Sequence, residues 1–223
     1  YAEAFKEFHR LSGESAGRYK LKEAIFELGP TGYPFEIFVS RLLREEGYRT
    51  RVGIIMEGDC VSHEIDVIAE RNEEYVMVEC KFHNRTHHHC SIKVPLYIQS
   101  RFLDIKSKWE QQPGHRHKKH LGCVATNTRF SSDAVTYAHC MGLRVLSWDY
   151  PKRKGIKDLV KKHNLHPLTC LSSISKTETE QLLENGIVFC RDIVNSSESL
   201  EHAVINPRHK KKIQKEAREI CTY

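Results

Sequence analysis

Apolar residues in the first part of the chain recur with the period of a helix. Residues 2–10 and 18–28 have this pattern, and the turn residues at 29–32 end it. A further helix is predicted from Pro34, which the first turn of a helix tolerates, to Gly47, which ends it. Its buried face is predicted to hold Phe35, Phe38, Val39, Leu42 and Leu43.

The next segments have the shorter period of strands. Three short runs rich in Val and Ile, separated by polar turns, predict adjacent strands at residues 51–56, 64–70 and 75–82. The pattern then predicts a helix at 94–109, a strand at 121–126, a helix at 132–141 and a strand at 143–148. This αβββαβαβ order predicts an α/β fold with a central mixed sheet flanked by helices on both faces.

The chain changes character after Pro151, where it becomes rich in lysine and helical. Ser175 and Glu178 form a capping box that opens a helix running to Glu184, and Gly186 is placed to end it. Residues 208–218 form a basic helix. We therefore expect three parts: a helical lead-in at 1–31, the α/β domain at 32–151 and a basic helical region at 152–223.

Composition narrows the class of protein. Among 223 residues, 39% are hydrophobic, and no apolar run approaches the roughly 20 residues of a membrane span, so no membrane segment is expected. The excess of 35 Lys and Arg over 29 Asp and Glu favours acidic partners. Eight cysteines without a CxxC pair predict reduced thiols and a cytoplasmic protein. The first residues resemble no signal peptide and contain no initiator methionine, so an upstream region is expected.

The candidate chemistry lies in the hairpin formed by the second and third strands. If its tip is centred on residues 72–73, opposed residues have numbers that sum to 145, and Asp66 lies opposite Glu79 while Glu64 lies opposite Lys81. Alternation then places these four charges on one face and a nearly wholly apolar set on the other, which is the predicted core face. The apolar set is His63, Ile65, Val67, Ala69, Val76, Val78, Cys80 and Phe82.

Two opposed carboxylates repel each other unless a proton or a cation lies between them. Mg²⁺ is commonly held by one or two carboxylates, water and phosphate oxygens, so Asp66 and Glu79 are the predicted metal ligands, with Mn²⁺ as a substitute. Lys81 shares their face and is predicted to contact the same phosphate or the attacking water. The alternative is a solvated hairpin face with ordinary cross-strand ion pairs.

The segments His63-Glu64-Ile65-Asp66-Val67-Ile68 and Val78-Glu79-Cys80-Lys81-Phe82 resemble the PD-(D/E)xK superfamily, specifically the Mrr-like restriction endonucleases. The resemblance covers residues 32–151. It implies a restriction-endonuclease-like core and a metal-dependent endodeoxyribonuclease with Asp66, Glu79 and Lys81 as catalytic residues. One departure is His63, where many relatives have glycine near that point; we interpret it as a core or rim histidine.

The chain is more similar still to restriction-endonuclease-like proteins with an upstream ATP-cone domain. The matching segments are residues 19–25, 28–30, 35–36 and 99–102. This similarity implies that Glu36 assists the metal site, with a plain helix-face charge as the alternative. It also implies that the ATP-binding cone precedes Tyr1, so that nucleotide binding by these 223 residues is not expected.

Several other groups are candidates for contacts with nucleic acid. Gln99 and Arg101 are selected by their place on the helix after the active strands. Three basic residues, Arg116, Lys118 and Lys119, are predicted to rim the active cleft and meet phosphates. Arg129 belongs to the segment 126–132, whose hydroxyls and amides could bind a phosphate at a helix N-terminus, or only cap that helix.

Two further motifs have competing interpretations. The histidines at 83, 87–89, 115, 117 and 120, with Cys90, raise the possibility of zinc, but they lack the paired spacing of structural zinc sites. Residues 168–194 resemble a helix-hairpin-helix element in which Ser173-Ile174-Ser175 stands where a DNA-gripping hairpin has glycines. Phosphate binding and packing or homodimerisation are the alternatives there.

The sequence thus predicts a Mg²⁺-dependent endonuclease that hydrolyses phosphodiester bonds in DNA. The second hypothesis is a module on a degenerate nuclease fold that binds nucleic acid without catalysis. The intact set of Asp66, Glu79 and Lys81 favours the first.

Overall fold

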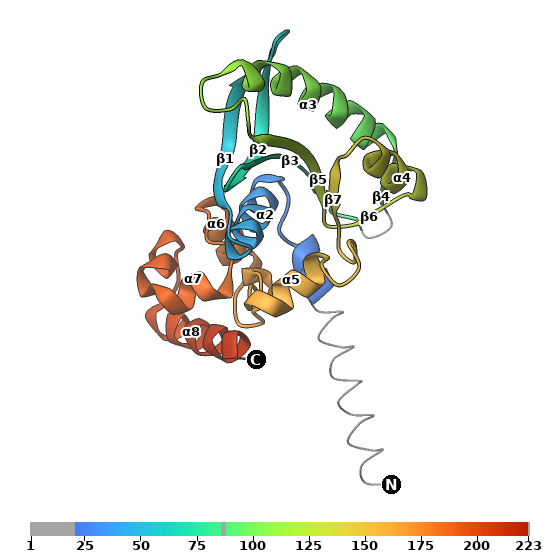
Figure 1. Cartoon of the computed structure of the whole chain (residues 1–223). Coiled ribbons are helices and arrows are strands. Elements are labelled where there is room, and N and C mark those ends of the chain that lie inside the picture. Colours follow the sequence, from blue (N-terminus) through green and yellow to red (C-terminus); the bar gives the residue numbers. More distant parts are fainter. Residues whose placement is uncertain (1–20, 86–87, 223) are drawn as a thin grey trace. The chain divides into compact units, whose positions relative to one another are not determined.

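The computed structural model describes residues 21–85 and 88–222 (Figure 1). The predicted helix at residues 2–10 lies outside the described residues, and residues 21–26 are helical as predicted. Contacts divide the chain into two units. Of the described residues, one unit lies within Gly29–His163, and the other joins residues 21–28 with residues 164–222.

The Gly29–His163 unit is built on a five-stranded mixed sheet in the order β1-β2-β3-β5-β7. The strands are β1 (Arg49–Glu57), β2 (Ser62–Arg71), β3 (Glu74–Lys81), β5 (Lys119–Thr126) and β7 (Arg144–Leu146). β1, β2 and β3 pair antiparallel, and β3, β5 and β7 pair parallel. The predicted α/β class and central mixed sheet are confirmed. Two short strands that were not predicted, β4 (His89–Cys90) and β6 (Arg129–Phe130), form a separate parallel pair.

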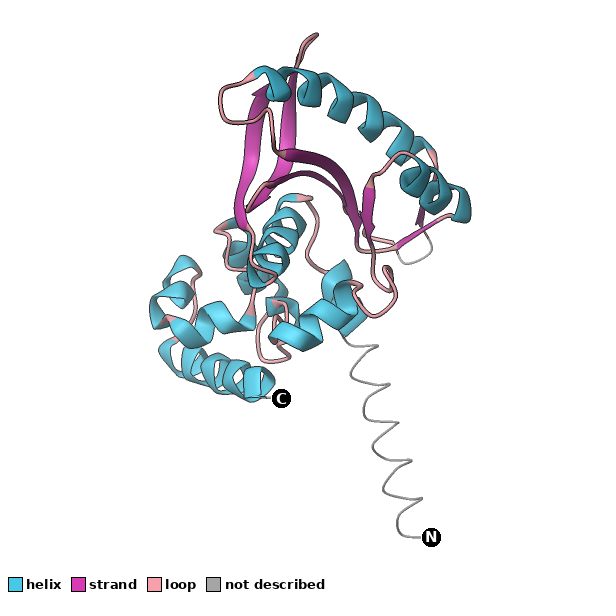
Figure 2. Ribbon diagram, viewed as in Figure 1, coloured by secondary structure: helices cyan, strands magenta, loops and turns pink. Residues whose placement is uncertain are grey.

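Helices cover both faces of this sheet (Figure 2). They are α2 (Tyr33–Glu45), α3 (Lys93–Gln111), α4 (Ser132–Cys140) and α5 (Ile156–His163). The ring of Phe35 in α2 lies 5.7 Å from that of Phe82, which places α2 on the face of the even-numbered residues of β3. α3 packs on the other face, where Phe102 and Trp109 share a core with Met77.

The β2–β3 hairpin has the predicted register. Its pairs run from Arg71↔Glu74 at the tip to Val67↔Val78, and their numbers sum to 145. Asn72 has a φ of 53°, which matches the left-handed backbone that two-residue hairpin turns require. The register is therefore confirmed, although the ladder ends before it reaches Asp66 and Glu79.

Both faces of this hairpin are covered, so the alternative of a solvated hairpin face is not supported. Ile68, Tyr75 and Met77, on the face of the charged residues, are at most 8% exposed. The reason is that β3 is a central strand with a helix on each side, so both of its faces are covered. The catalytic candidates consequently occupy only the end of a face that is otherwise buried.

The start of β3 is cross-linked to its neighbours. The Glu74 carboxylate accepts hydrogen bonds from the Tyr48 hydroxyl at 2.6 Å and from the Arg144 guanidinium at 2.6 and 3.0 Å. Arg71 stacks over the Tyr48 ring, with its guanidinium carbon 4.2 Å from the ring centroid. These contacts join β3 to β7 and to the segment between α2 and β1.

The first unit extends beyond the expected boundary at residue 151. Ile156, Leu159 and Val160 of α5 are buried, and the amide of Ile156 donates to the Ser147 carbonyl at 2.9 Å. The Glu46 carboxylate pairs with Lys162 and His163 of α5, each at 2.6 Å. The lysines that distinguish this segment in sequence lie on the outer side of a helix whose inner side belongs to the α/β unit.

The second unit is helical. Its elements are η1 (Leu168–Cys170), α6 (Lys176–Glu184), α7 (Cys190–Asn195), η2 (Ser197–His202) and α8 (Pro207–Thr222). The capping box of Ser175 and Glu178 is present, as predicted. The Thr169 hydroxyl donates to the Ala24 carbonyl at 2.5 Å, which ties the helical segment at 21–26 to this unit rather than to the sheet.

The phosphate-binding interpretation of residues 168–194 is not supported. The amides of Ser172 and Ser173 donate to the Glu216 carboxylate of α8 at 2.7 and 2.8 Å, and the Ser172 hydroxyl donates to the same group at 2.7 Å. The donors that would face a phosphate are thus taken by an internal carboxylate. Packing is the role that this contact supports.

Candidate active site at the open end of the central hairpin

The strands β2 and β3 part where the candidate residues begin. Beyond Val67↔Val78 no main-chain ladder is present, and the Asp66 carboxylate instead accepts the amide of Cys80 at 2.6 Å. The Asp66 side chain thus takes the place of a main-chain carbonyl as the acceptor of the Cys80 amide, and it stays between the two strands. Where the strands part, Asp66 lies near enough to Glu79 for the charge of Glu79 to act on it.

Glu79 is held by two cations. It is only 5% exposed, and its carboxylate contacts the Lys81 ammonium at 2.7 Å and the Arg101 guanidinium at 2.5 Å. Arg101 also donates to the carbonyl of Glu64. The predicted cross-strand pairing of Lys81 with Glu64 is therefore replaced by a pair within β3, and Arg101 bridges the two parted strands.

Burial, together with neighbouring charges, raises the pKa of two carboxyl groups at this site. Burial, followed by the charge of Glu79, raises the pKa of Asp66 to about 6. Burial, followed by the charges of Asp66, Glu64 and Glu79, raises the pKa of Glu36 to about 7. Glu36 therefore lies close to the predicted pair, and the structure brings together all four residues predicted as catalytic: Glu36, Asp66, Glu79 and Lys81.

Lys81 remains positively charged despite partial burial. Burial favours the neutral amine, but the hydrogen bond and charge of Glu79 and the charge of Asp66 outweigh it and raise the pKa of Lys81. Its main chain is fixed by the Thr126 hydroxyl, which donates to the Lys81 carbonyl at 2.8 Å. The ammonium is thus a fixed positive charge beside two carboxylates.

Carboxylate oxygens are the donors that a hard divalent cation prefers. The charges of Glu36, Glu64, Asp66 and Glu79 act on one another, and among the ion pairs of the described residues Lys81 and Arg101 are the cations that pair with this set. The set therefore has an excess of negative charge when its carboxyls are ionised. Among the described residues no group of three or more His, Cys, Asp or Glu side chains is arranged to hold a metal ion. Mg²⁺ needs no such cage, because one or two carboxylates can hold it while water and phosphate fill the other positions.

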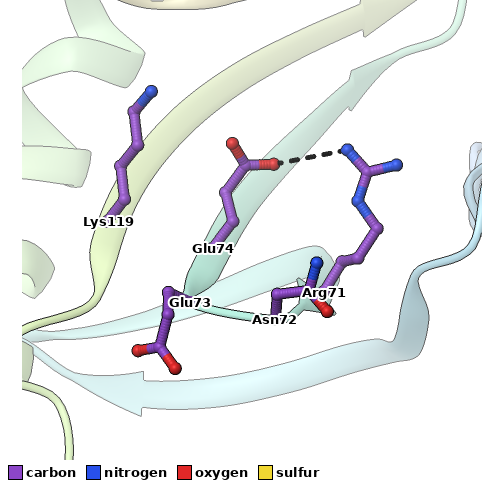
Figure 3. A pocket seen from close by; sticks show the side chains of 5 residues that line it. All are labelled: Arg71, Asn72, Glu73, Glu74 and Lys119. Atoms are coloured by element: carbon purple, nitrogen blue, oxygen red, sulfur yellow. Dashed lines mark ion pairs between the residues drawn. The ribbon is translucent and has the colours of Figure 1, made fainter.

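The predicted basic rim is not at this site. β3 and β5 run parallel with Glu74 beside Lys119 and Lys81 beside Thr126, so Lys119 lies about 17 Å along the sheet from Glu79. Lys119 lines a shallow pocket of about 290 Å³ at that far end with Arg71, Asn72, Glu73 and Glu74 (Figure 3). Lys118 donates to the Tyr75 hydroxyl at 3.1 Å, and Arg116 is exposed in the turn before β5.

The remaining nucleic-acid candidates have different positions. Gln99 is 6% exposed and turned inward, and its carbonyl oxygen has no hydrogen-bond partner among residues 21–85 and 88–222. Arg101 lies in the site but is engaged with Glu79. Arg129 follows the end of β5 that lies beside Lys81, and it pairs with Asp149 at 2.9 Å. Ser131 caps α4 by accepting the Ala134 amide at 3.2 Å, which supports the capping interpretation.

Four of the histidines form two clusters. The rings of His83 and His88 stack with their centroids 5.4 Å apart, and Cys90 Sγ lies 3.5 Å from His83 Nε2. His115 and His120 instead pack with Tyr75 and Trp109 at the far end of the sheet. His63 is a rim residue, as interpreted, and contacts Asp104 at 2.7 Å. His87 lies outside the described residues.

An uncharacterized protein of Archaeoglobus fulgidus is similar to this chain. The two are 40% identical over 160 residues, which is 72% of this chain and 86% of the relative. In agreement, residues 166–221 match the family described as AF1548-like, C-terminal. The chain belongs to the AF1548-like family.

A crystal structure of this family is similar over most of its length. It is described as a protein of unknown function, AF1548, and it superposes with a TM-score of 0.72 at 35% identity, covering 86% of this chain and 99% of that one. The AF1548-like fold therefore includes both the sheet and the helical region. No helix among the described residues is long and apolar enough to cross a membrane.

Arg101 is a site residue whose main role sequence reasoning missed. Its position on the helix after the active strands was recognised, but the expected contact was with nucleic acid. Its i−4 neighbour Tyr97 and its i+3 neighbour Asp104 lie on the same side of α3, and Asp104 binds the β1–β2 turn. This spacing is a signal that Arg101 also faces β2.

Proposed function

We propose that this AF1548-like protein is a Mg²⁺-dependent endonuclease that hydrolyses phosphodiester bonds in DNA, with Mn²⁺ as an alternative metal. The observation that carries the proposal is the meeting of Glu36, Asp66, Glu79 and Lys81 at the point where β2 and β3 part. Free thiols at all eight cysteines support a cytoplasmic location as part of the same proposal.

The residues of this site have different proposed roles. Asp66 and Glu79 would hold the cation, and Glu36 is close enough to assist them electrostatically. When bound, Mg²⁺ supplies Lewis-acid chemistry, which activates water and neutralises charge on the phosphate. Lys81 places a fixed ammonium beside the same carboxylates, where it stabilises negative charge that develops on the phosphate in the transition state.

Arg101 positions the Glu79 carboxylate. Because Glu79 is nearly fully buried, a neutral or misplaced neighbour would leave its charge without compensation. The guanidinium contacts one carboxylate oxygen and Lys81 contacts the other. Each oxygen retains a lone pair that can coordinate a metal.

The test is cleavage of labelled single-stranded, duplex and branched DNA, and of RNA, with Mg²⁺, Mn²⁺ or Ca²⁺ and without added metal. Cleavage that needs Mg²⁺ or Mn²⁺ and is abolished by Asp66→Ala and by Glu79→Ala, with binding retained, is the expected result. The exposed Glu45→Gln in α2 is the matched control and should cleave normally. Full activity in Asp66→Ala or Glu79→Ala would refute the site.

Binding without cleavage would favour the second hypothesis, a degenerate nuclease fold that only binds nucleic acid. Salt titration then adds information, because phosphate contacts release counterions and make the affinity fall steeply with salt. A salt-insensitive affinity would point to another class of partner.

A further inference from the structure

One side of α3 makes the contacts that hold the open hairpin. The Asp104 carboxylate accepts the amides of Cys60 and Val61 at 2.8 and 3.4 Å, and Arg101 contacts Glu79 and the Glu64 carbonyl. Tyr97 is the next residue on this side, one turn before Arg101. Its ring lies 5.5 Å from the Arg101 guanidinium carbon and the residue is 59% exposed.

A second exposed aromatic residue lies at the same end of the sheet on the other face. Tyr33 begins α2, is 49% exposed and precedes Glu36 by one turn. The contact between Phe35 and Phe82 places the start of α2 beside the end of β3. Tyr33 and Tyr97 therefore lie one turn before Glu36 and Arg101, on the two helices that cover opposite faces.

Two of the exposed groups in this region are thus aromatic, and Arg129, which follows the neighbouring end of β5, is paired with Asp149. Two of its cationic side chains, Lys81 and Arg101, are paired with Glu79, and the basic residues Lys118 and Lys119 lie at the far end of the sheet. A duplex presents mainly phosphates and would call for a basic rim. Unpaired bases expose flat π faces that stack on aromatic rings, largely irrespective of sequence.

We propose that Tyr97 and Tyr33 are base-stacking platforms and that the substrate carries unpaired nucleotides next to the scissile phosphate. The substrate class is therefore single-stranded DNA or DNA with single-stranded arms. This inference rests on the proposed nuclease function and narrows its substrate. Arg101, stacked against Tyr97, connects base binding to the position of Glu79.

The experiment uses the whole chain with Ca²⁺, which is not expected to support cleavage, and a short oligonucleotide containing 2-aminopurine. Its fluorescence is quenched when the base stacks, and anisotropy of an end label gives the affinity. The oligonucleotide is compared as a single strand and as a full duplex. Variants are Tyr97→Ala, Tyr33→Ala, Tyr97→Phe and, as a control on the same helix, the exposed Leu103→Ala.

The single strand should bind more tightly than the duplex. Tyr97→Ala should weaken its binding by about 5-fold to 100-fold and reduce the quenching, because this is the range that loss of one stacked base produces. Tyr97→Phe keeps the ring and should bind normally, as should Leu103→Ala. Tyr33→Ala should weaken binding in the same way as Tyr97→Ala.

The inference fails if both alanine variants bind the single strand like the parent chain, or if the duplex binds at least as tightly. A parallel reaction with Mg²⁺ separates this failure from failure of the nuclease proposal. Cleavage restricted to fully paired duplex overturns the stacking platforms and leaves the nuclease intact. Ring-dependent binding without any Mg²⁺-dependent cleavage upholds the platforms and overturns the nuclease.

Discussion

Arg101 and Glu79 form an ion pair of 2.5 Å between side chains that are 13% and 7% exposed. When a buried carboxylate loses its charged partner, its charge stays in the protein interior without compensation. For such pairs this costs about 3–5 kcal/mol. We therefore expect Arg101→Met to lower the free energy of unfolding by about 2–4 kcal/mol in urea titrations. Arg101→Lys should recover only part of the loss, because it lacks the planar fork that reaches both Glu79 and the Glu64 carbonyl.

The double variant Arg101→Met, Glu79→Gln is the internal check on this prediction. Removing both charges should be less destabilising than the sum of the single changes, which gives a coupling energy of about 1 kcal/mol or more. Ser107→Ala, on an exposed position of the same helix, is the control. Additive single changes would show that the two side chains do not stabilise each other.

The second prediction concerns the ammonium of Lys81. Lys81→Met should reduce single-turnover cleavage by orders of magnitude, while DNA and Mg²⁺ still bind, because the charge acts chiefly in the transition state. Lys81→Arg should rescue poorly, since a wide guanidinium does not reproduce a compact charge. If Lys81→Met cleaves like the parent chain at saturating Mg²⁺, Lys81 is only the partner of Glu79.

The third prediction is a pH dependence of stability. The pKa of Glu36 is about 7 in the folded chain against an ordinary value of 4.5, so the folded state retains a proton that the unfolded chain has lost between these values. The stability that this protonation confers is complete below about pH 4.5 and is lost as the pH rises through 7. In metal-free protein, Glu36→Gln should therefore raise the Tm at pH 8 by a few degrees and change it little at pH 4.5.

Thermal unfolding in chelator at both pH values measures this effect. Glu45→Gln at the exposed end of the same helix is the control and should show no comparable pH-dependent gain. Mg²⁺ affinity should rise between pH 5 and 8, because Asp66, with a pKa of about 6, must lose its proton to bind the ion. An affinity that is constant over this range would exclude Asp66 as a ligand.

The fourth prediction concerns the turn between β1 and β2. A Cβ atom on Gly58 would lie 2.1 Å from the Asp104 carboxylate and 2.7 Å from the Val61 carbonyl, so Gly58→Ala must displace the turn. We expect a loss of about 1–3 kcal/mol in unfolding free energy. Asp104→Ala should instead leave the amides of Cys60 and Val61 without their acceptor and accelerate their hydrogen exchange. Unchanged exchange in Asp104→Ala would contradict the contact.

The fifth prediction concerns the helical unit. Burial opposes the charge of Glu216, but hydrogen bonds from Ser173 and Ser172 outweigh it and lower its pKa to about 2. The stability that follows is present above about pH 4.5 and is lost as the pH falls toward 2. Glu216→Gln should destabilise this unit at pH 7 and have little effect near pH 2. Glu219→Gln, also in α8, is the control. An equal loss of stability in Glu219→Gln would show that the contacts of Glu216 with Ser172 and Ser173 do not stabilise this unit.

Sequence periodicity predicted the sheet well because each strand and helix has a continuous local pattern. The register of the β2–β3 hairpin followed from its two-residue turn, although the ladder ends at Val67 and Val78, one pair before Asp66 and Glu79. The buried state of Tyr75 and Met77 could not be predicted from alternation, because it depends on α3, which is distant in sequence. The same applies to Lys119, since the parallel pairing of β3 and β5 decides which end of the sheet it reaches.

Contacts between residues distant in sequence also could not be predicted from the local sequence pattern. Nothing near Glu216 in sequence indicates that its carboxylate binds the amides of Ser172 and Ser173. The lysines of α5 likewise suggested a new unit, although its apolar side belongs to the sheet. In both cases the contact joins segments that are distant in sequence, so only the tertiary structure shows it.

The cross-linked start of β3 has a consequence for how this unit responds to heat and to mutation. Tyr48, Glu74 and Arg144 join three segments at one end, whereas at the other end β2 and β3 are connected by side chains alone. Local opening should therefore begin around Asp66 and Cys80 and proceed toward the turn at Asn72. Opening at this end can therefore stay local and leave the main-chain pairing near the turn intact.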